Sequence, residues 1–139
     1  MIDPLDASIQ IATSGLEAHS IRMRIISENM ANAESTGSTP GADPYTRKVV
    51  TFADEVDRAT GADLVKVDNV GNDRSPFHVE YDPGNPAADS RGFVKLPNVN
   101  LITELADMRE ANRSYTGNIE VIKQSRELYN MTVDLLKNS

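Results

Sequence analysis

The sequence has no cysteine and no tryptophan, and aromatic residues make up only 5% of it. Without cysteine the chain can form neither a disulfide nor a thiolate metal site, although this absence fits every cellular compartment. No stretch approaches the roughly 20 consecutive apolar residues that a transmembrane helix needs. Hydrophobic residues still amount to 39%, which exceeds the content typical of disordered chains. We therefore expect a soluble, folded protein with a core of moderate size.

Positive charge is also scarce. The formal net charge is −7, and the paired basic residues at 22 and 24 and at 47 and 48 belong to no longer basic run. A surface that binds nucleic-acid phosphates needs a concentration of positive charge, so this function class is disfavoured. The first six residues, MIDPLD, contain acidic residues where a secretory signal has basic ones. We expect no cleaved signal peptide.

Nothing in the sequence indicates an active site. The two histidines, His19 and His78, lie about sixty residues apart, and neither has neighbours typical of a catalytic triad or a metal site. We interpret His19 as a polar residue of a helical seam and His78 as a solvent-facing residue of a strand. The stretch DNVGND at residues 68–73 lacks the closing glutamate of an EF-hand and reads as a plain loop. We expect no enzyme, no metal and no cofactor.

The first segment with helical periodicity covers residues 3–33. Asp3 can cap this helix and Pro4 suits its first position. Gly15 costs roughly 1 kcal/mol relative to alanine inside a helix, which indicates a closely packed neighbour. A coiled-coil-like stripe with alternating spacings of four and three consists of Leu5, Ile9, Ala12, Leu16, His19, Met23, Ile26 and Met30.

The last segment, from Leu101 to Lys137, has the same periodicity, and Asn98 or Asn100 can cap it. Its stripe consists of Leu101, Leu105, Met108, Asn112, Tyr115, Ile119, Ile122, Arg126, Tyr129, Val133 and Leu136. A shift by one residue gives Ala111, Asn118 and Ser125 instead. The buried seam of this helix is therefore predicted to be broad and mixed.

Between the two helices the pattern changes to short strands. Four stretches are typical of strands, namely residues 45–52, 64–70, 77–81 and 92–96. The stretches STPGADP at 38–44 and DPGNP at 82–86 are strong turn signals. A β-region this small buries little by itself and is expected to be an insertion.

These patterns predict a mainly α fold with a small inserted β region. We expect an N-terminal axial-core helix in residues 1–36, a linker and β-rich region in residues 37–98, and a C-terminal axial-core helix in residues 99–139. The long terminal helices would pack as a coiled-coil-like pair. Such a pair leaves apolar surface uncovered, so either the β region or neighbouring subunits must complete its burial. Periodicity alone leaves an intramolecular hairpin and an assembly contact equally open.

Two asparagines near the end of the first helix, Asn29 and Asn32, are three residues apart and share a helix face. A buried asparagine fixes the register between helices, and Ala31 and Ala33 permit close approach of a partner backbone. Alternatively, Asn32 ends the helix in a left-handed cap. Both roles are compatible, because one asparagine can cap while the other fixes register.

Four motifs in the chain resemble those of the bacterial flagellar rod, hook and hook-associated axial proteins. The first combines SGLEA at 14–18 with ENMANA at 28–33, and the second is PYTRKVVTF at 44–52. The third combines YDPGNPAAD at 81–89 with GFV at 92–94 and PNVN at 97–100, and the fourth runs from Glu104 to Asn118. The resemblance covers nearly the whole chain and is strongest to the proximal rod members. The sequence departs from the family pattern at Met30, at residues 37–38 and at residues 116–117, and these departures concern packing only.

The resemblance implies a structural subunit of the flagellar basal-body rod, which crosses the periplasm and is exported by the flagellar export apparatus without a cleaved signal. Its terminal helices would form the inner helical core of a tube that acts as drive shaft and export channel. The implied partners are the rod proteins FlgB, FlgF and FlgG, the protein FliE, and further copies of the chain. No nucleic-acid or direct lipid contact is implied.

On this basis we predict a set of assembly-interface residues, in which the two seams bury against each other within and between subunits and the asparagines fix register. The set is Leu5, Ile9, Leu16, Met23, Ile26, Asn29, Ala31, Asn32, Tyr45, Leu105, Met108, Tyr115, Asn118, Ile122 and Tyr129. The alternative is a soluble coiled-coil adapter, which would form a stable helical dimer in dilute solution. A small hydrolase is a third hypothesis, but it has no residues to support it.

Overall fold

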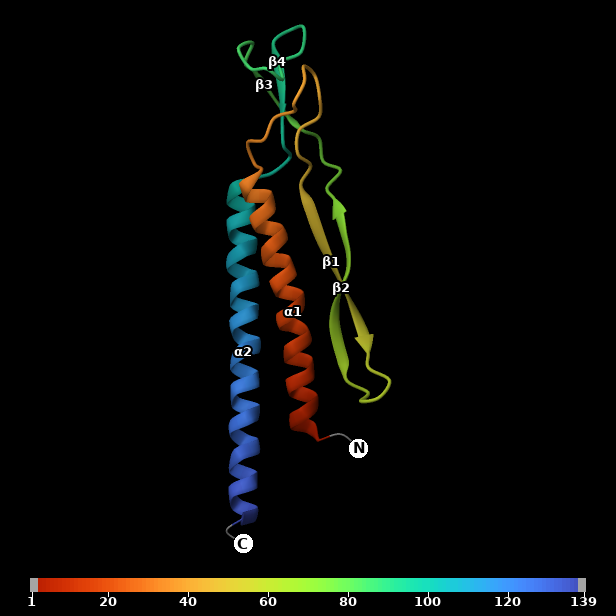
Figure 1. Ribbon diagram of the computed structural model, residues 1–139, viewed down its shortest axis with the longest axis vertical. Coiled ribbons are helices and arrows are strands. Elements are labelled where there is room, and N and C mark those ends of the chain that lie inside the picture. Colours follow the sequence, from red (N-terminus) through yellow and green to blue (C-terminus); the bar gives the residue numbers. More distant parts are fainter. Residues whose placement is uncertain (1–2, 138–139) are drawn as a thin grey trace. The chain divides into compact units, whose positions relative to one another are not determined.

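The computed structural model describes residues 3–137 and contains two long helices and four strands (Figure 1). In chain order these are α1 (Pro4–Ala31), β1 (Lys48–Val56), β2 (Asp63–Asn72), β3 (His78–Tyr81), β4 (Phe93–Leu96) and α2 (Leu101–Lys137). The prediction of a mainly α fold with a small β insertion is confirmed. Across residues 3–137, neither helix combines the length and the apolar character that crossing a membrane requires.

Side chains that the sequence marks as caps define both helix starts. The Asp3 carboxylate accepts the Leu5 N–H at 2.9 Å, and the Asn100 side-chain oxygen accepts the Ile102 and Thr103 N–H groups at 2.9 and 3.2 Å. These bonds satisfy N–H groups that have no partner within the helix. The predicted caps at Asp3 and Asn100 are therefore confirmed, whereas Asn98 has a different role.

The end of α1 differs from the expectation that Asn32 ends the helix in a left-handed cap. The Asn32 side-chain amide donates to the Glu28 carbonyl at 2.8 Å, and the Asn32 backbone N–H donates to the same carbonyl at 3.2 Å. Among residues 3–137, no residue other than glycine has a positive φ. The predicted left-handed cap at Asn32 is wrong, because Asn32 has no positive φ and its side-chain amide instead adds a second hydrogen bond to the Glu28 carbonyl in the last turn.

The four strands form two separate two-stranded sheets, β1 with β2 and β3 with β4. In the second sheet the strands are antiparallel, with Val79 opposite Lys95 and Tyr81 opposite Phe93. All four predicted strands are present with shifted bounds. Residues 45–47 precede β1 rather than opening it, and residues 68–72, which read as a loop, are the end of β2.

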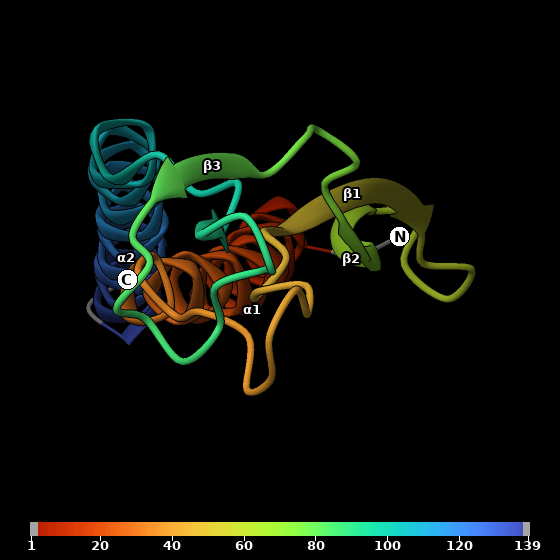
Figure 2. The same ribbon diagram turned by 90° about the horizontal axis from the view of Figure 1, so that it is seen from above.

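The chain divides into two compact units, each with part of both helices. The first contains residues 3–23, 51–69 and 109–137, and the second contains residues 24–50 and 70–108. In the first unit, α1 lies between α2 and the β1–β2 hairpin (Figure 2). Arg22 pairs with Glu110 at 3.3 Å across the antiparallel helices, and the Ser14 hydroxyl accepts the Val65 N–H of β2 at 3.1 Å.

Small side chains fill the contact between the helices of the first unit. Ala12 and Ala18 of α1 are each 2% exposed, and Ala111 of α2 is fully buried. A Cβ added to Gly15 would lie 2.5 Å from the Asn118 side-chain nitrogen, so any larger residue there requires the Asn118 side chain to move. The predicted close neighbour of Gly15 is therefore confirmed, and it is Asn118.

The buried line on α2 runs one residue before the predicted stripe. Its members are spaced by seven residues, and their side chains are buried or half-buried: Glu104, Ala111, Asn118 and Ser125. The larger residues of the predicted stripe flank this line. Leu105 and Tyr129, for example, are 49% and 50% exposed. In the first unit, close backbone approach favours small residues such as Ala111 and Ser125 on this line and leaves large ones at its margins.

We predict that two glycine-to-alanine substitutions in the helices have different effects. Gly117→Ala meets no atom within 4 Å and should raise the free energy of unfolding by about 1 kcal/mol through helix propensity. Gly15→Ala should lose this gain to the clash with Asn118, and the double variant Gly15→Ala/Asn118→Ala should recover part of it. Urea unfolding followed by circular dichroism measures all three. Equal stabilisation by the two single substitutions would contradict the close contact.

Candidate functional site

The second unit contains a buried polar network centred on Asn29 in the last turn of α1. Asn29 is 1% exposed, and its amide nitrogen donates to the Lys48 carbonyl at 2.9 Å and to the Glu104 carboxylate at 3.1 Å. Its side-chain oxygen accepts the Lys48 N–H at 2.8 Å and the Tyr45 hydroxyl at 2.9 Å. Both amide hydrogens and both oxygen lone pairs are therefore satisfied within the chain.

Glu104, in the first turn of α2, is the acidic centre of the same network. Its side chain is fully buried, and the Arg47 Nε donates to it at 2.5 Å. The remaining guanidinium nitrogens of Arg47 reach Asp73 at 3.3 Å and Asp107 at 3.5 Å. A buried carboxylate is stable only when it is paired and hydrogen-bonded, and Arg47 and Asn29 together meet that requirement.

Asn98 extends the network to the segment that follows β2. Its amide nitrogen donates to the Asp73 and Ser75 carbonyls at 3.1 and 3.0 Å, and its oxygen accepts the Arg47 N–H at 2.8 Å. Asn98 is 6% exposed, so these bonds lie largely out of water. The Asn29–Glu104 network, as we call it, consists of Asn29, Tyr45, Arg47, Lys48, Asp73, Asn98 and Glu104.

This network joins four segments that are distant in sequence: the end of α1, the segment before β1, the segment after β2, and the start of α2. Burial raises the pKa of the Tyr45 phenol, which keeps its hydroxyl a hydrogen-bond donor to Asn29. The register that Asn29 fixes in this structure is that of residues 45–48 against α1. Asn32 instead closes the helix end.

Sequence reasoning singled out Asn29 and Tyr45 but missed their partners. Arg47, Asn98 and Glu104 all lie within the motifs that carry the family resemblance, yet no periodicity marks them as buried. Arg47 and Glu104 are 57 positions apart, and charged residues are ordinarily exposed. The motifs were the one signal that could have found them.

The other residues predicted for an assembly interface differ in how far they are covered within the chain. Ile26 is buried, with 5% exposure. Half-buried are Leu5, Ile9, Leu16, Met23, Met108, Tyr115, Asn118 and Ile122, while Ala31, Leu105 and Tyr129 are exposed. The structure brings Asn29 and Tyr45 into one hydrogen-bonded cluster, and it places Gly15 and Asn118 in contact.

A second notable residue is His19 of α1, in the first unit, which lies close to both β1 and α2. Its ring packs edge-on against Phe52 of β1, with the ring centres 5.7 Å apart, and its Nδ1 atom is buried without a hydrogen-bond partner. Burial lowers the pKa of His19, and the positive charge of Arg22 lowers it further, while Glu110 of α2 partly opposes this. The interpretation of His19 as a polar seam residue holds, but it faces β1 as well as a helix.

The buried polar side chains bind backbone groups and one another, and a long helix presents apolar residues, which is an arrangement typical of a structural protein. Comparisons with known proteins agree. The family model described as "Flagellar basal body rod FlgEFG protein C-terminal" matches residues 90–135. A relative named flagellar basal-body rod protein FlgC, from Agrobacterium fabrum, is 62% identical over 99% of both chains.

More distant relatives carry the same name. The FlgC of Salmonella typhimurium is 40% identical over 90% of this chain and 92% of its own, and that of Borreliella burgdorferi is 36% identical over 96% and 98%. The chain belongs to the FlgC family of flagellar basal-body rod proteins. It is a structural component of the rod and not an enzyme.

We predict that Asn29→Ala lowers the free energy of unfolding by roughly 2–4 kcal/mol, because the buried Lys48 N–H and carbonyl lose their Asn29 partner and the Glu104 carboxylate keeps only Arg47. Asn32→Ala is the matched control. It removes two hydrogen bonds near the end of the same helix, one to the Glu28 carbonyl and one from the Ser35 hydroxyl, and should cost about 1 kcal/mol, since the Glu28 carbonyl keeps the Asn32 backbone N–H. Urea unfolding curves of both variants measure the difference, and similar losses would argue against the central role of Asn29.

We also predict a pH dependence of stability that arises from His19. Its pKa in the folded chain lies below the 6.5 of a free histidine, so the unfolded chain binds more protons below that pH. The contribution of neutral His19 is fully present above about pH 6.5 and is lost as the pH falls towards its folded pKa. For the parent protein, the urea concentration at the midpoint of unfolding should fall as the pH is lowered from 7.5 to 5.

His19→Leu should reduce that fall, whereas His78→Gln, which removes the exposed histidine of β3, should preserve it. A parent protein and a His19→Leu variant with the same pH profile would show that the His19 site does not titrate as its burial requires.

Proposed function

We propose that the chain assembles helically through its two terminal helices, forming part of the periplasm-crossing drive shaft and of the channel for exported subunits. The observation that carries this proposal is the apolar surface of α2. Many of its large side chains are between 43% and 79% exposed: Leu101, Ile102, Leu105, Val121, Leu128, Tyr129, Met131 and Leu135. Apolar residues this numerous on one helix mark a surface that another molecule covers.

The C-terminal part of α2 has no helix opposite it within the described chain. A small cavity of about 220 Å³ lies between Asp6 and Ile9 of α1 and residues 126, 129 and 130 of α2. The first turns of α1 therefore lie opposite residues 126–130, and residues 131–137 continue beyond them (Figure 1). Leu135, in this extension, is 73% exposed. Burying such a side chain yields about 1.5–3 kcal/mol, which a neighbouring helix would provide.

The proposed interface keeps the large apolar residues of the predicted set that are exposed or half-buried, and it assigns them two places. The half-buried side chains of α1, from Leu5 to Met23, would be covered further by helices of neighbouring subunits, together with Met108, Tyr115 and Ile122 of α2. Leu105 and Tyr129, which are exposed, would contact neighbours only. Because these contacts join different surfaces, they repeat from subunit to subunit and build a filament.

In this proposal, residues 1–36 and 99–139 form the axial core, and residues 37–98 contact neighbours further out. The partners would be FlgB, FlgF, FlgG, FliE, further copies of the chain, and the flagellar export apparatus during transport. The family membership and the resemblance of the four motifs support this assignment. The chain would act after export without a cleaved signal, in the periplasmic part of the basal body.

We predict that Leu128→Asp/Leu135→Asp abolishes rod assembly and swimming while the isolated chain keeps its unfolding midpoint, because both side chains are already exposed. Lys123→Asp places the same charge at another exposed position of α2 and should retain assembly. Swimming assays and electron microscopy of isolated basal bodies measure the outcome. Normal rods in the double variant would exclude this surface as an assembly contact, and a stable dimer in sedimentation would favour a soluble coiled-coil adapter.

A further inference from the structure

Outside the helices, exposed large apolar side chains gather on the two hairpins. Phe52, Val56 and Val70 are exposed on β1–β2, and Val79, Tyr81 and Phe93 are exposed on β3–β4. Val56 of β1 is 59% exposed, and Val79 and Tyr81 of β3 are 62% and 65% exposed, so these side chains contribute little to the burial within their own hairpins.

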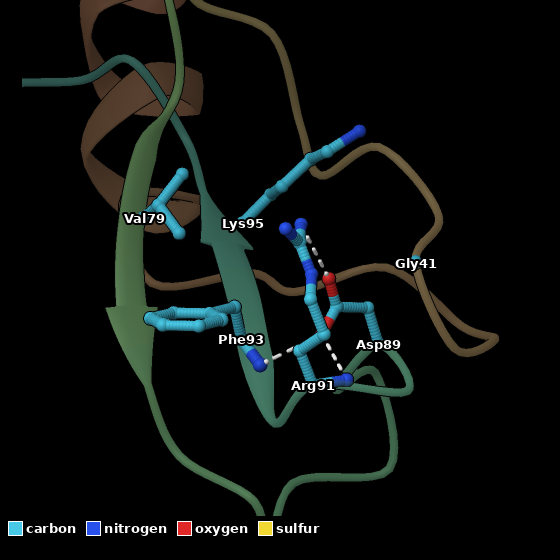
Figure 3. A pocket seen from close by; sticks show the side chains of 6 residues that line it. All are labelled: Gly41, Val79, Asp89, Arg91, Phe93 and Lys95. Atoms are coloured by element: carbon cyan, nitrogen blue, oxygen red, sulfur yellow. Dashed lines mark hydrogen bonds and ion pairs between the residues drawn. The ribbon is translucent and has the colours of Figure 1, made fainter.

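The β3–β4 hairpin carries its apolar residues on one face together with positive charge. In the strand register Val79 is opposite Lys95 and Tyr81 is opposite Phe93, so these four side chains share a face. The face borders a cavity of about 540 Å³ lined by Gly41, Val79, Asp89, Arg91, Phe93 and Lys95 (Figure 3). The Arg91 guanidinium lies 5.9 Å from the centre of the Phe93 ring.

The loop before β4 holds this surface rigidly. Asp89 accepts the N–H groups of Arg91 and Phe93 at 2.8 and 3.0 Å, so its carboxylate is committed to the loop. Gly92, with a φ of +85°, lets Tyr81 pack closely, since a Cβ there would lie 2.9 Å from the tyrosine ring. The Tyr81 and Phe93 rings meet edge to face at 5.3 Å.

The cations of this surface retain donors for a ligand. Arg91 is 79% exposed and uses one guanidinium nitrogen on Asp89, although the group has five N–H donors. The Lys95 ammonium donates to Asp43 at 2.7 Å and has two further N–H groups. An apolar floor with two such cations fits an extended segment that combines an apolar side chain with carboxylates.

The end of β1 has that chemistry. The sequence from 54 to 57 is Asp-Glu-Val-Asp, in which Asp54, Glu55 and Val56 are all exposed. Glu55 pairs with Lys66 at 3.1 Å at the surface, and Asp57 caps its own turn, which leaves Asp54 as the carboxylate beside Val56 without a protein partner in the described residues. This end of the hairpin carries four carboxylates, because Asp63 adds to the three at 54, 55 and 57. Its two cations, Arg58 and Lys66, therefore leave it negatively charged.

We propose that the β1 end of one copy, residues 54–56, docks on the β3–β4 face of a second copy, with Val56 against Val79 and Phe93 and with Asp54 against Arg91. The contact joins two different surfaces, so it would repeat from copy to copy around the assembly. This inference rests on the proposed function, because it requires copies of the chain to be neighbours. It adds a contact outside the helical core.

Because the chain has no cysteine, a single introduced pair reports the contact without background. We expect a Val56→Cys chain and a Val79→Cys chain, expressed together in cells without the native protein, to form a disulfide-linked dimer in oxidised basal bodies. Either variant alone should form none. Lys123→Cys with Val79→Cys is the control pair and should also form none. Intact rods without a disulfide between positions 56 and 79, or a link from position 79 to a different rod protein, would overturn the inference.

A charge exchange tests the same contact independently and decides the matter if a cysteine variant fails to assemble. Asp54→Arg and Arg91→Glu should each reduce swimming, and the double variant should restore it, while the isolated chains remain folded, because Arg91→Glu removes only a surface ion pair whose arginine is 79% exposed. Absence of restoration would contradict the proposed pairing. The disulfide and charge-exchange results can be distinguished from a failure of the proposed function. The Leu128→Asp/Leu135→Asp variant tests the helical core and leaves both hairpins intact.

Discussion

The fully buried carboxylate of Glu104 is the interaction on which the second unit depends. A charge without contact with water needs a cation and further hydrogen bonds, and the chain supplies them from segments far apart in sequence, through Arg47 and Asn29. Such bonds are directional, so they hold the end of α1, the start of β1 and the start of α2 at defined positions. Apolar contacts between the same elements would permit sliding. The polar network therefore provides specificity more than stability.

In the first unit the corresponding constraint is the distance between two helix backbones. Gly15 admits the Asn118 side chain, and Ala12, Ala18 and Ala111 allow the helices to approach along the rest of the contact. Small residues bury little apolar area, so this contact is close but contributes modest hydrophobic stabilisation. The larger apolar side chains remain at its margins, partly exposed. In the proposed assembly, these margins are the places where helices of neighbouring subunits would pack.

Much of the fold was predictable from sequence, because local chemistry decides it. The caps Asp3 and Asn100 mark the helix starts, and both long helices and all four strands follow from periodicity and turn residues. Of the two lines that periodicity offered for α2, the shifted one with Ala111, Asn118 and Ser125 is the buried one, since close approach of the helices favours it over the stripe of large apolar residues. The burial of Glu104 was not predictable, because it depends on a partner 57 positions away.

The two kinds of contact suit a load-bearing subunit in different ways. A shaft that transmits torque must resist twisting between the elements of each subunit, which directional bonds such as those of Asn29 achieve. It must also tolerate small differences of curvature between neighbouring subunits, which apolar surfaces such as that of α2 permit. The structure places its directional bonds inside the chain and its exposed apolar residues on α2 and the hairpins. In the proposed assembly, the directional bonds would keep the second unit rigid, and the exposed apolar residues would give adjustable contacts between subunits.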